Sequence, residues 1–430
     1  MAKYQQYDEY KDSGVVSIGL VPKNWSVSRL KQVVDQNRQV TYGIVQAGPN
    51  VKEGVYYIRP ADMTEETGVK NYENLLKTSP EIAASYERSK IKAGDIICSI
   101  GPSFGKLMIT PEYLDGANLT QGTARVAISS EYNTGYFFWA LRSTCSFQQW
   151  ESSVGGATFR ALNLGPLADT FLAIPTNSEQ AKIANFLDFE TAQIDTLIEK
   201  QQTLIQLLKE KRQAVISHAV TKGLNPDAPM KDSGVEWLGE VPEHWTIVKL
   251  SYRMKLLSGD GITSQDIEPT GQYPVYGGNG LRGYTDRYNC EGHHVLIGRQ
   301  GALCGNINLA QGKFFATEHA VVVYPYQDFN ISFLSEFLRF MDLGQYSVSA
   351  AQPGISVERI NGLKILVPPY YEQTEIGEHV ENIIKRFEDL STKANQQIKL
   401  LQERRTALIS AAVTGKIDVR GWQSPDNKAS

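Results

Sequence analysis

The chain has 430 residues, of which 41% are hydrophobic and 10% aromatic, and its formal net charge at pH 7 is −4. This length is enough for about three domains that each bury a core, and the composition is typical of a soluble globular protein. No run of about 18 apolar residues occurs, which excludes a membrane-spanning helix, so we expect no membrane partner. The negative balance excludes a chain that is basic all over, so for nucleic-acid binding either the basic residues are focused on one face of each unit or a partner supplies much of the phosphate contact.

The first residues and the cysteines predict a cytoplasmic protein. Residues 1–8, Met-Ala-Lys-Tyr-Gln-Gln-Tyr-Asp, lack the apolar stretch of a signal peptide. No Cys-x-x-Cys pair occurs, which favours free thiols in a reducing compartment. The four cysteines are Cys98, Cys145, Cys290 and Cys304.

The chain contains a long internal repeat. Residues 11–15 (Lys-Asp-Ser-Gly-Val) return at 231–235, and Trp25 returns as Trp245, both 220 residues later. A second echo begins at Glu179-Gln180 and returns at Glu372-Gln373, 193 residues later. The two offsets differ by 27 residues, so the first half is longer between its echoes. We therefore expect a duplicated frame that carries two dissimilar inserts.

Each insert mixes short β-type runs with Gly and Pro turns and ends in a strand that runs into a proline, Pro175 or Pro368. Both are therefore predicted to be small α+β domains. The expected strands lie at residues 55–58, 95–98, 124–128 and 171–174 in the first insert and 294–297, 320–324 and 364–367 in the second, with short helices at 136–141 and 333–340.

A long helix follows each insert. Ser178 is a candidate N-cap of the first helix, since Glu179 then lies in the first turn, where an acidic side chain is favourable. Apolar residues recur with a period close to 3.5 in both helices, which predicts a buried seam. The expected seam residues are Leu187, Ile194, Leu197, Ile205, Leu208 and Val215 in the first helix and Val380, Phe387, Leu390, Ile398, Leu401 and Leu408 in the second.

Two copies of one seam in a single chain predict intramolecular pairing, and a two-fold relation between the halves makes the helices antiparallel. The predicted fold class is therefore α+β: two globular α/β domains separated by two long helices that form an antiparallel intramolecular coiled coil with pseudo-two-fold symmetry. Helices of about 40 residues, roughly 60 Å long, would act as a ruler between two binding domains. The predicted segments are a lead-in at 1–25, domain 1 at 26–175, helix 1 at 176–222, a linker and repeated lead-in at 223–245, domain 2 at 246–368, helix 2 at 369–415 and a tail at 416–430.

Motifs for catalysis are missing or incomplete. Residues 259–264 contain glycines but lack the lysine of a phosphate-binding loop, so we interpret them as a turn. Cys290 with His293 and His294 offers a zinc alternative, but adjacent histidines in a strand point to opposite faces. Residues 367–370 (Val-Pro-Pro-Tyr) resemble the loop with which amino-methyltransferases hold a flipped base, but valine replaces the required amide or carboxylate. We expect no catalytic residue, metal site or cofactor in this chain.

The repeated frame carries a family resemblance. Residues 231–245, Lys-Asp-Ser-Gly-Val-Glu-Trp-Leu-Gly-Glu-Val-Pro-Glu-His-Trp, resemble the lead-in of specificity (S) subunits of type I restriction–modification enzymes. The helices that begin at Glu179-Gln180 and Glu372-Gln373 resemble the two conserved spacer helices of that family, and the inserts resemble its two variable target-recognition domains. The first lead-in departs at residues 16–18, where Val-Ser-Ile replaces the Glu-Trp-Leu of the second. The resemblance covers nearly the whole chain in the family's order.

This resemblance implies a function. In the family, each target-recognition domain reads one half of a bipartite sequence in double-stranded DNA, and the paired helices set the unread spacer. The helices also dock two modification (methyltransferase) subunits, which bind S-adenosylmethionine and methylate adenine, and restriction/translocase subunits that use ATP and Mg join them. The specificity subunit itself is non-catalytic. Because the two inserts differ, we expect an asymmetric target. The alternative is a two-headed protein-binding scaffold without sequence-specific DNA recognition.

Base edges are read by side chains that donate and accept in pairs, and glycine-bearing loops allow close approach to a groove. In the second insert, loops 298–301 and 276–284 have this character, with Arg299 suited to guanine and Gln300 to adenine. In the first insert we expect loop 99–106 and the residues after strand 55–58 to serve, and two lysines to contact phosphates. For each, the alternative is a turn held by a surface ion pair. The predicted DNA-binding residues are Arg299, Gln300, Asn279, Arg282, Ser103, Lys106, Arg59, Asp62 and Lys92.

Overall fold

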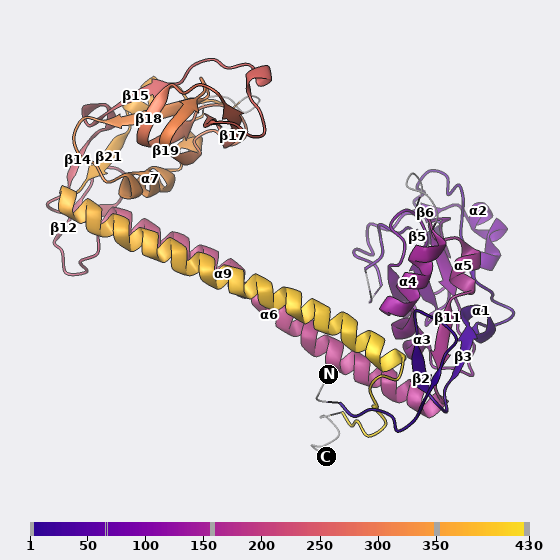
Figure 1. Ribbon diagram of the computed structural model, residues 1–430. Coiled ribbons are helices and arrows are strands. Elements are labelled where there is room, and N and C mark those ends of the chain that lie inside the picture. The colour runs from indigo at the N-terminus through magenta and orange to yellow at the C-terminus, as the bar shows by residue number, and fades with distance from the viewer. Residues whose placement is uncertain (1–3, 65, 67, 155–159, 348–352, 425–430) are drawn as a thin grey trace. The chain divides into compact units, whose positions relative to one another are not determined.

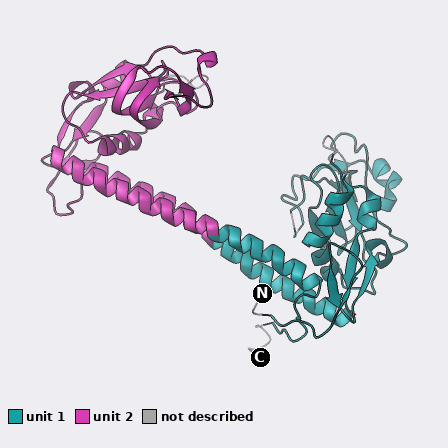
Figure 2. Ribbon diagram, in the orientation of Figure 1, with its two compact units in different colours: residues 1–200, 397–430 teal, residues 201–396 magenta. Residues whose placement is uncertain are grey.

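The computed structural model describes residues 4–64, 66, 68–154, 160–347 and 353–424 (Figure 1). The chain divides into two compact units, which Figure 2 distinguishes by colour. Unit 1 consists of residues 1–200 and 397–430, and unit 2 consists of residues 201–396. Two long helices, α6 (Asn177–Lys222) and α9 (Tyr370–Val413), contribute residues to both units. Within the described parts of the chain, no helix combines the length and apolarity needed to cross a bilayer.

Unit 1 is built around two sheets. The larger is antiparallel with strand order β4-β10-β7-β8, and the smaller has the order β6-β5-β9. Strand β7 is buried on both faces, because Ile96 and Cys98 join one apolar cluster and Ile97 joins another. The elements are β4 (Thr41–Tyr42), β5 (Val55–Ile58), β6 (Lys77–Thr78), β7 (Ile96–Ser99), β8 (Leu107–Ile109), β9 (Asn118–Leu119), β10 (Thr123–Val126), α1 (Leu30–Val33), α2 (Pro80–Ser85), α3 (Thr134–Leu141), α4 (Thr144–Ser153) and α5 (Leu164–Ala168).

Unit 2 contains one six-stranded sheet with the order β15-β20-β18-β19-β16-β17. All its neighbours are antiparallel except β16 and β19, which are parallel. Its central strand β18 is also buried on both faces, with Val295 and Ile297 in one cluster and Leu296 in another. The elements are β15 (Met254–Ser258), β16 (Tyr273–Gly277), β17 (Gly280–Thr285), β18 (Cys290–Gly298), β19 (Ile307–Ala316), β20 (Ala320–Pro325), α7 (Ile331–Phe340) and α8 (Val357–Asn361).

The repeated lead-ins fold into the same hairpin in the two units. In unit 1, β1 (Tyr10–Asp12) pairs with β2 (Leu20–Pro22), and in unit 2, β12 (Met230–Asp232) pairs with β13 (Glu240–Pro242) in the same register. Asp12 and Asp232 each accept a hydrogen bond at 2.9 Å from the amide of the glycine two residues later. A two-stranded sheet follows each hairpin, β3 (Ser26–Arg29) with β11 (Phe171–Ile174) and β14 (Thr246–Lys249) with β21 (Lys364–Val367).

The Glu-Gln echo ties each domain to its long helix. Gln180 is fully buried, accepts from the amide of Asn133 at 3.0 Å and donates to the carbonyl of Pro175 at 3.0 Å. Gln373 makes the same two bonds with Asn330 and Pro368, at 3.0 and 2.9 Å. One side chain thus satisfies two backbone groups at the point where strand, short helix and long helix meet. The preceding glutamates accept from Trp25 Nε1 and Trp245 Nε1, which links the lead-in to the same point.

The two long helices run antiparallel. In unit 1 the early residue Leu187 of α6 packs in the same core as the late residue Leu408 of α9, and in unit 2 the late residue Val220 of α6 packs in the same core as the early residue Val380 of α9. In unit 1 the Arg405 guanidinium also donates to Asp195 at 2.9 Å. The predicted fold class, two globular α+β domains with an antiparallel pair of long helices, is confirmed.

Two of the predicted seam residues are wrong. Leu197 is 45% exposed and Leu390 is 39% exposed, whereas Ile198 packs against the core of unit 1. Leu197 lies three residues after Ile194 and Ile198 lies four residues after it, so a 3.5-residue period allows either residue on the seam and the packing selects Ile198. Leu390 likewise lies one position before Ser391, which is half-buried.

The N-cap predicted for the first long helix is also wrong. Helix α6 begins at Asn177, so Ser178 lies inside its first turn. Thr176 occupies the cap, where its hydroxyl lies 3.4 Å from the Glu179 amide and Glu179 accepts from the Thr176 amide at 3.3 Å. This reciprocal pair is a capping box, which satisfies two of the unpaired groups at a helix start.

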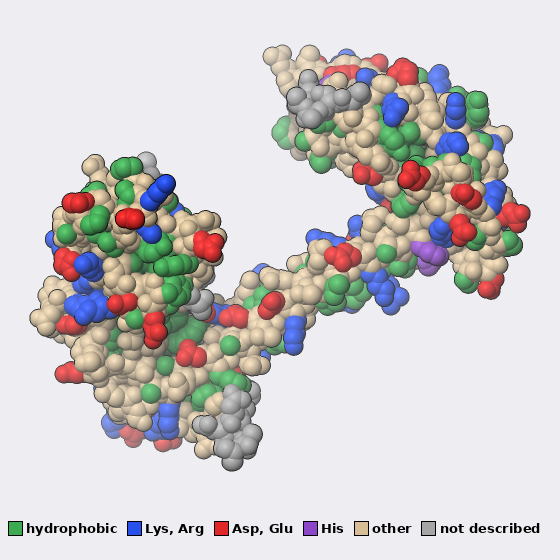
Figure 3. Space-filling model, turned by 180° about the vertical axis from the view of Figure 1, so that it is seen from behind, with side chains coloured by type: hydrophobic (Ala, Val, Ile, Leu, Met, Phe, Trp, Pro, Cys, Tyr) green, Lys and Arg blue, Asp and Glu red, His purple; other side chains and the backbone are tan. Residues whose placement is uncertain are grey.

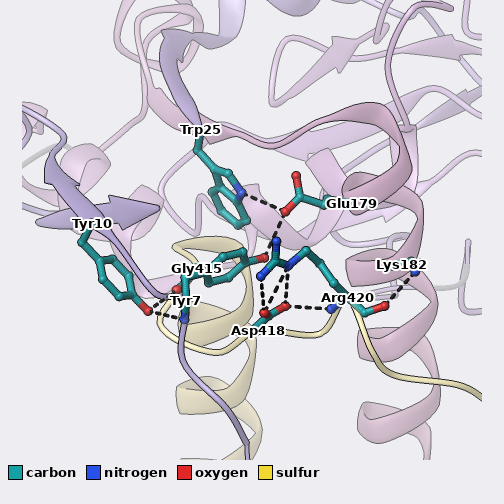
Figure 4. Close-up of polar contacts among 8 residues, drawn as sticks. All are labelled: Tyr7, Tyr10, Trp25, Glu179, Lys182, Gly415, Asp418 and Arg420. Carbon is teal, nitrogen blue, oxygen red and sulfur yellow. Dashed lines mark hydrogen bonds and ion pairs between the residues drawn. The ribbon is translucent and has the colours of Figure 1, made fainter. Parts of the chain in front are cut away.

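The N-terminal segment and the C-terminal tail meet in unit 1 (Figure 4). The amide of Asp418 donates to the carbonyl of Gln5 at 2.8 Å, and the Arg420 guanidinium lies over the ring of Tyr7. Tyr7 and Trp25 both donate to Glu179 at 3.3 Å. The lead-in, the tail and the start of α6 therefore form one hydrogen-bonded cluster.

Candidate nucleic-acid interface

In unit 2 the two predicted base-reading loops lie side by side. A Cβ built on Gly298 would lie 1.9 Å from the carbonyl oxygen of Gly278, so the backbones touch and only glycine fits. Asn279, Arg282 and Gln300 are exposed on these loops. The side-chain Nδ2 of Asn306 donates to Asn279 Oδ1 at 3.4 Å, which joins a third segment to the same edge. The structure thus brings together all four residues predicted for this domain.

Arg299 is the most firmly placed of the four. It is half-buried, and its Nη1 donates to Ser258 Oγ at 3.1 Å. Its Nε is buried without a partner among the residues that the structure describes. Its backbone amide and carbonyl are both bonded, to His319 and Ile355, at 3.0 Å each. The backbone of Arg299 is therefore fixed on both sides, its guanidinium donates to one hydroxyl, and no ion pair of Arg299 occurs within the described residues.

In unit 1 the loops after β5 and β7 both pack on the turn between β9 and β10. The amide of Ile100 donates to the carbonyl of Gly122 at 2.8 Å, and a Cβ built on Gly122 would lie 2.9 Å from the Pro60 ring. Ser103 is exposed and Lys106 half-buried on the second loop. Phe104 stacks on Phe147 with a centroid distance of 5.7 Å, which seats this loop on α4.

Arg59 and Asp62 hold each other. Arg59 Nε and Nη2 donate to the two oxygens of Asp62 at 2.9 and 2.7 Å, and the Asp62 carboxylate also accepts from the Arg59 amide. The hydrogen bond from Asp62, ahead of burial in the opposite direction, raises the pKa of Arg59. The pair forms a closed turn, so base contact by either residue would use only the donors and acceptors that face away from the partner.

The two edges are built from equivalent positions. The amide of Ile100 bonds to Gly122 and its carbonyl to Leu162, as Arg299 bonds to His319 and Ile355. Ile100 is only 7% exposed, so the position that presents a guanidinium in unit 2 packs into the core in unit 1. A further match lies beside each edge: a Cβ on Gly43 or Gly259 would lie 1.8 or 2.0 Å from the carbonyl oxygen of Leu119 or Ala316. Residues 259–264 therefore owe their first glycine to close backbone contact.

Sequence reasoning missed the turn at the centre of each edge. Gln121 is exposed between the two loops of unit 1, and Glu318 and His319 occupy the equivalent turn of unit 2. The Oε2 atom of Glu318 is buried without a partner within the described residues, and its Oε1 lies 3.4 Å from His319 Nε2. The available signal was weak: Leu119-Thr120 and Ala316-Thr317 precede matching apolar strands 197 residues apart.

Lys92 lies away from this edge. It precedes β7, whereas the loop with Ser103 and Lys106 follows β7 at the other end of the strand. Lys92 is exposed at a separate pocket that Arg38, Arg88 and Arg125 also line. On the face shown in Figure 3, Lys and Arg side chains are interspersed with Asp and Glu over each unit. The pocket beside Lys92 differs from this mixed surface, because five cationic side chains and two carboxylates line it.

The cysteines have no catalytic character. All four are free, as predicted, and all four are buried. Burial raises the pKa of the Cys98 thiol to about 12, so it is protonated at neutral pH. In the part of the chain that the structure describes, no group of three or more His, Cys, Asp or Glu side chains could hold a metal ion. His294 bonds instead to backbone carbonyls of Val323 and Glu291.

Comparison with known families decides the identity. A model of the family "Type I restriction modification DNA specificity domain" matches residues 22–209 and again residues 242–400, which together are most of the chain. The chain belongs to this family. The two matched regions coincide with the two halves of the repeat, so each unit carries one copy of the specificity domain.

Named relatives of this specificity-domain chain include two proteins from Escherichia coli. The EcoprrI specificity subunit is 40% identical over 147 residues, which are 33% of this chain and 36% of that protein. The EcoKI specificity subunit is 22% identical over 96% of this chain and 93% of its own length. The match thus spans about a third of the first relative and nearly all of the second.

Solved structures show the fold. The HsdS subunit from Thermoanaerobacter tengcongensis aligns over 92% of this chain and 98% of its own, with 16% identity and a TM-score of 0.57. A chain from a structural study of complex assembly and conformational transition of the type I R-M system aligns over 91% and 98%, with 17% identity and a TM-score of 0.68. At these identities the likeness concerns the fold alone.

Proposed function

We propose that this chain is the non-catalytic DNA specificity subunit of a type I restriction–modification enzyme and that each unit reads one half of an asymmetric bipartite target. The pair of equivalent edges with unlike side chains carries the proposal. Arg299, with its partner-free Nε, and exposed Gln300 offer donors and acceptors in unit 2. The same place in unit 1 has buried Ile100, with exposed Gln121 and Ser103 nearby. Two such edges would select two different half-sites.

The long helices supply the second part of the function. Helices α6 and α9 have 46 and 44 residues, so each is about 66–69 Å long at 1.5 Å per residue. Duplex DNA repeats about every 34 Å, and a stiff pair of helices would hold the unread spacer between half-sites constant. The target would therefore have a spacer of one length.

The two long helices also carry exposed leucines that partner subunits could contact. On α6, Leu204 is 43% and Leu207 is 56% exposed, and on α9, Leu400 is 56% exposed. These exposed leucines would give partner subunits apolar contacts on the paired helices. The proposed partners are two modification subunits and the restriction/translocase subunits. S-adenosylmethionine, ATP and Mg would belong to those partners, and catalysis would lie with them.

The experiment is selection from random duplexes by the chain assembled with the modification subunits of its own system. We expect one recovered motif with two unlike half-sites and a fixed unread spacer, together with adenine methylation within it. Modification subunits without this chain are the control and should recover no motif. If the recovered duplexes show no sequence preference and the DNA affinity does not change with salt, the protein-binding scaffold is favoured instead. Specific DNA complexes release counterions and therefore weaken as the salt concentration rises.

A further inference from the structure

A positively charged pocket lies in unit 1 at the end of β7 opposite the base-reading loops. The pocket has a volume of about 590 Å³ and is lined by five cationic side chains and two carboxylates. One carboxylate, Glu87, pairs with Lys90 at 2.6 Å, and the other, Asp115, accepts from the Ala93 amide at 2.9 Å. Cations therefore outnumber the acids that could balance them.

Arg125 forms the floor of this pocket. It is 5% exposed, and its guanidinium donates to the carbonyls of Arg88 at 2.6 Å, Lys90 at 2.8 Å and Gln39 at 3.3 Å. Its Nε is buried without a partner within the described residues, and it forms no ion pair there. A buried guanidinium held only by neutral carbonyls has no hydrogen-bonded carboxylate among the described residues, although the charges of Asp95 and Asp35 act on it at longer range. Burial, followed by the charge of Arg38, lowers the pKa of Arg125 and outweighs the opposite effect of Asp95 and Asp35.

The carboxylate of Asp95, which acts on Arg125, is already paired with Arg38. Arg38 Nη1 donates to Asp95 Oδ1 at 2.8 Å, and the second nitrogen of Arg38 bonds to the second oxygen of Asp95. The rim of the pocket carries exposed Arg88 and Lys92. The pocket thus joins a fixed, buried cation to two exposed ones, an arrangement that suits a phosphate group.

We propose that this pocket binds a phosphate group and that the DNA backbone supplies it while the loops at the other end of β7 enter the groove. The inference rests on the proposed function. The four residues of β7 (Ile96–Ser99) span about 13 Å at roughly 3.3 Å per residue. The major groove is about 12 Å wide, so with β7 lying across the groove the loops would enter it while the pocket meets a flanking phosphate strand. The contact would position unit 1 without reading sequence.

The test uses the chain assembled with its modification subunits and measures DNA affinity against salt concentration. The double variant Arg88→Gln/Lys92→Gln removes both rim charges and leaves Arg125, whose loss would strand three carbonyls. We expect the slope of log affinity against log salt to fall by about 1–2 with the recovered motif unchanged. The matched control, Lys11→Gln/Lys23→Gln, makes the same charge change on the β1–β2 hairpin and should keep the wild-type slope.

The outcomes separate the two proposals. An unchanged slope in the rim variant, with salt-dependent binding by the wild type, overturns the DNA-phosphate assignment alone. Salt-insensitive binding by the wild type overturns the proposed function. Inorganic phosphate is the second probe. Phosphate could protect the wild type, but not the rim variant, against thermal unfolding while the salt slope of DNA binding is the same for both. That result would mean that the pocket binds a free anion, and it would also overturn the assignment to DNA.

Discussion

The two candidate recognition edges have the same backbone arrangement and differ in the side chains that they present. Arg299 and Ile100 make equivalent backbone hydrogen bonds, yet one is half-buried with a guanidinium at the edge and the other is 7% exposed. In unit 2 the adjoining loop is also one residue longer, closing from Gly298 to Gly305 rather than from Ser99 to Gly105. The duplicated frame therefore sets the position of the edge in each unit. Single substitutions and small changes in loop length decide which side chains the edge presents to a base.

The frame should respond alike in both units, and this is the largest effect that we expect. Gln180→Leu and Gln373→Leu each leave one backbone amide and one carbonyl without a partner in a buried place. At about 1–3 kcal/mol for each group, either change should lower the free energy of unfolding by about 2–6 kcal/mol. Chemical denaturation of the two variants checks this. A large loss in one unit only would break the equivalence of the frames.

The edge of unit 1 should fail by losing stability. Ile100→Ala removes a buried side chain from the core of unit 1, and such truncations cost about 2–5 kcal/mol. We expect a lower unfolding midpoint and an unchanged recovered DNA motif at temperatures where the variant is folded. A changed base preference with full stability would mean that Ile100 contacts DNA directly.

The edge of unit 2 should fail by losing specificity. Arg299→Ala should weaken binding of the preferred duplex by about 1–3 kcal/mol and relax the preference at one base position. Binding to a panel of single-base variants measures this, with Arg253→Ala as the control because Arg253 lies outside the edge and bonds to Gln327. An unaltered preference would remove Arg299 from the set of base-reading residues.

The smallest effect concerns pH. Burial raises the pKa of Glu372, but hydrogen bonds from Trp245, His244 and Tyr371 outweigh it and lower the pKa overall. A lowered folded pKa adds stability above the unfolded value of about 4.3, and this is lost as pH falls through the folded pKa. Glu372→Gln should therefore reduce the acid dependence of unfolding, by on the order of 1 kcal/mol or less. Glu388→Gln, on an exposed part of α9, is the control, and equal acid profiles for both variants would contradict the assignment.

Much of the fold could be predicted because its signals are local. The strand at 55–58, the helices near 136–141 and 333–340 and the two long helices all appear where residue patterns placed them. The wrong predictions concern residues one or two positions apart. Leu197 was predicted on the seam where Ile198 packs, and Ser178 was predicted as the N-cap where Thr176 lies. Neighbours of similar type give nearly the same pattern, and packing decides between them.

The site was predicted in part for the same reason. Glycine-bearing loops pointed to Arg299, Gln300, Asn279 and Arg282, which lie on one edge of unit 2. Gln121, Glu318 and His319 escaped notice, because a short turn between two strands has no distinctive composition. Their importance comes from the loops that pack on both sides of them.

By itself the sequence determined the duplicated frame, the family, the two α+β inserts and the paired helices. Repeats, periodicity and turn residues are local signals, because each occurs within one continuous stretch of the chain. Only the tertiary structure decided that Arg299 and Ile100 occupy equivalent positions and that Arg59 forms an ion pair with Asp62. It also decided that Lys92 lines a pocket with Arg125 and does not lie on the loop of Lys106. These relations depend on the pairing of strands that are distant in the chain, and loops of unequal length conceal that register from any comparison of residues in order.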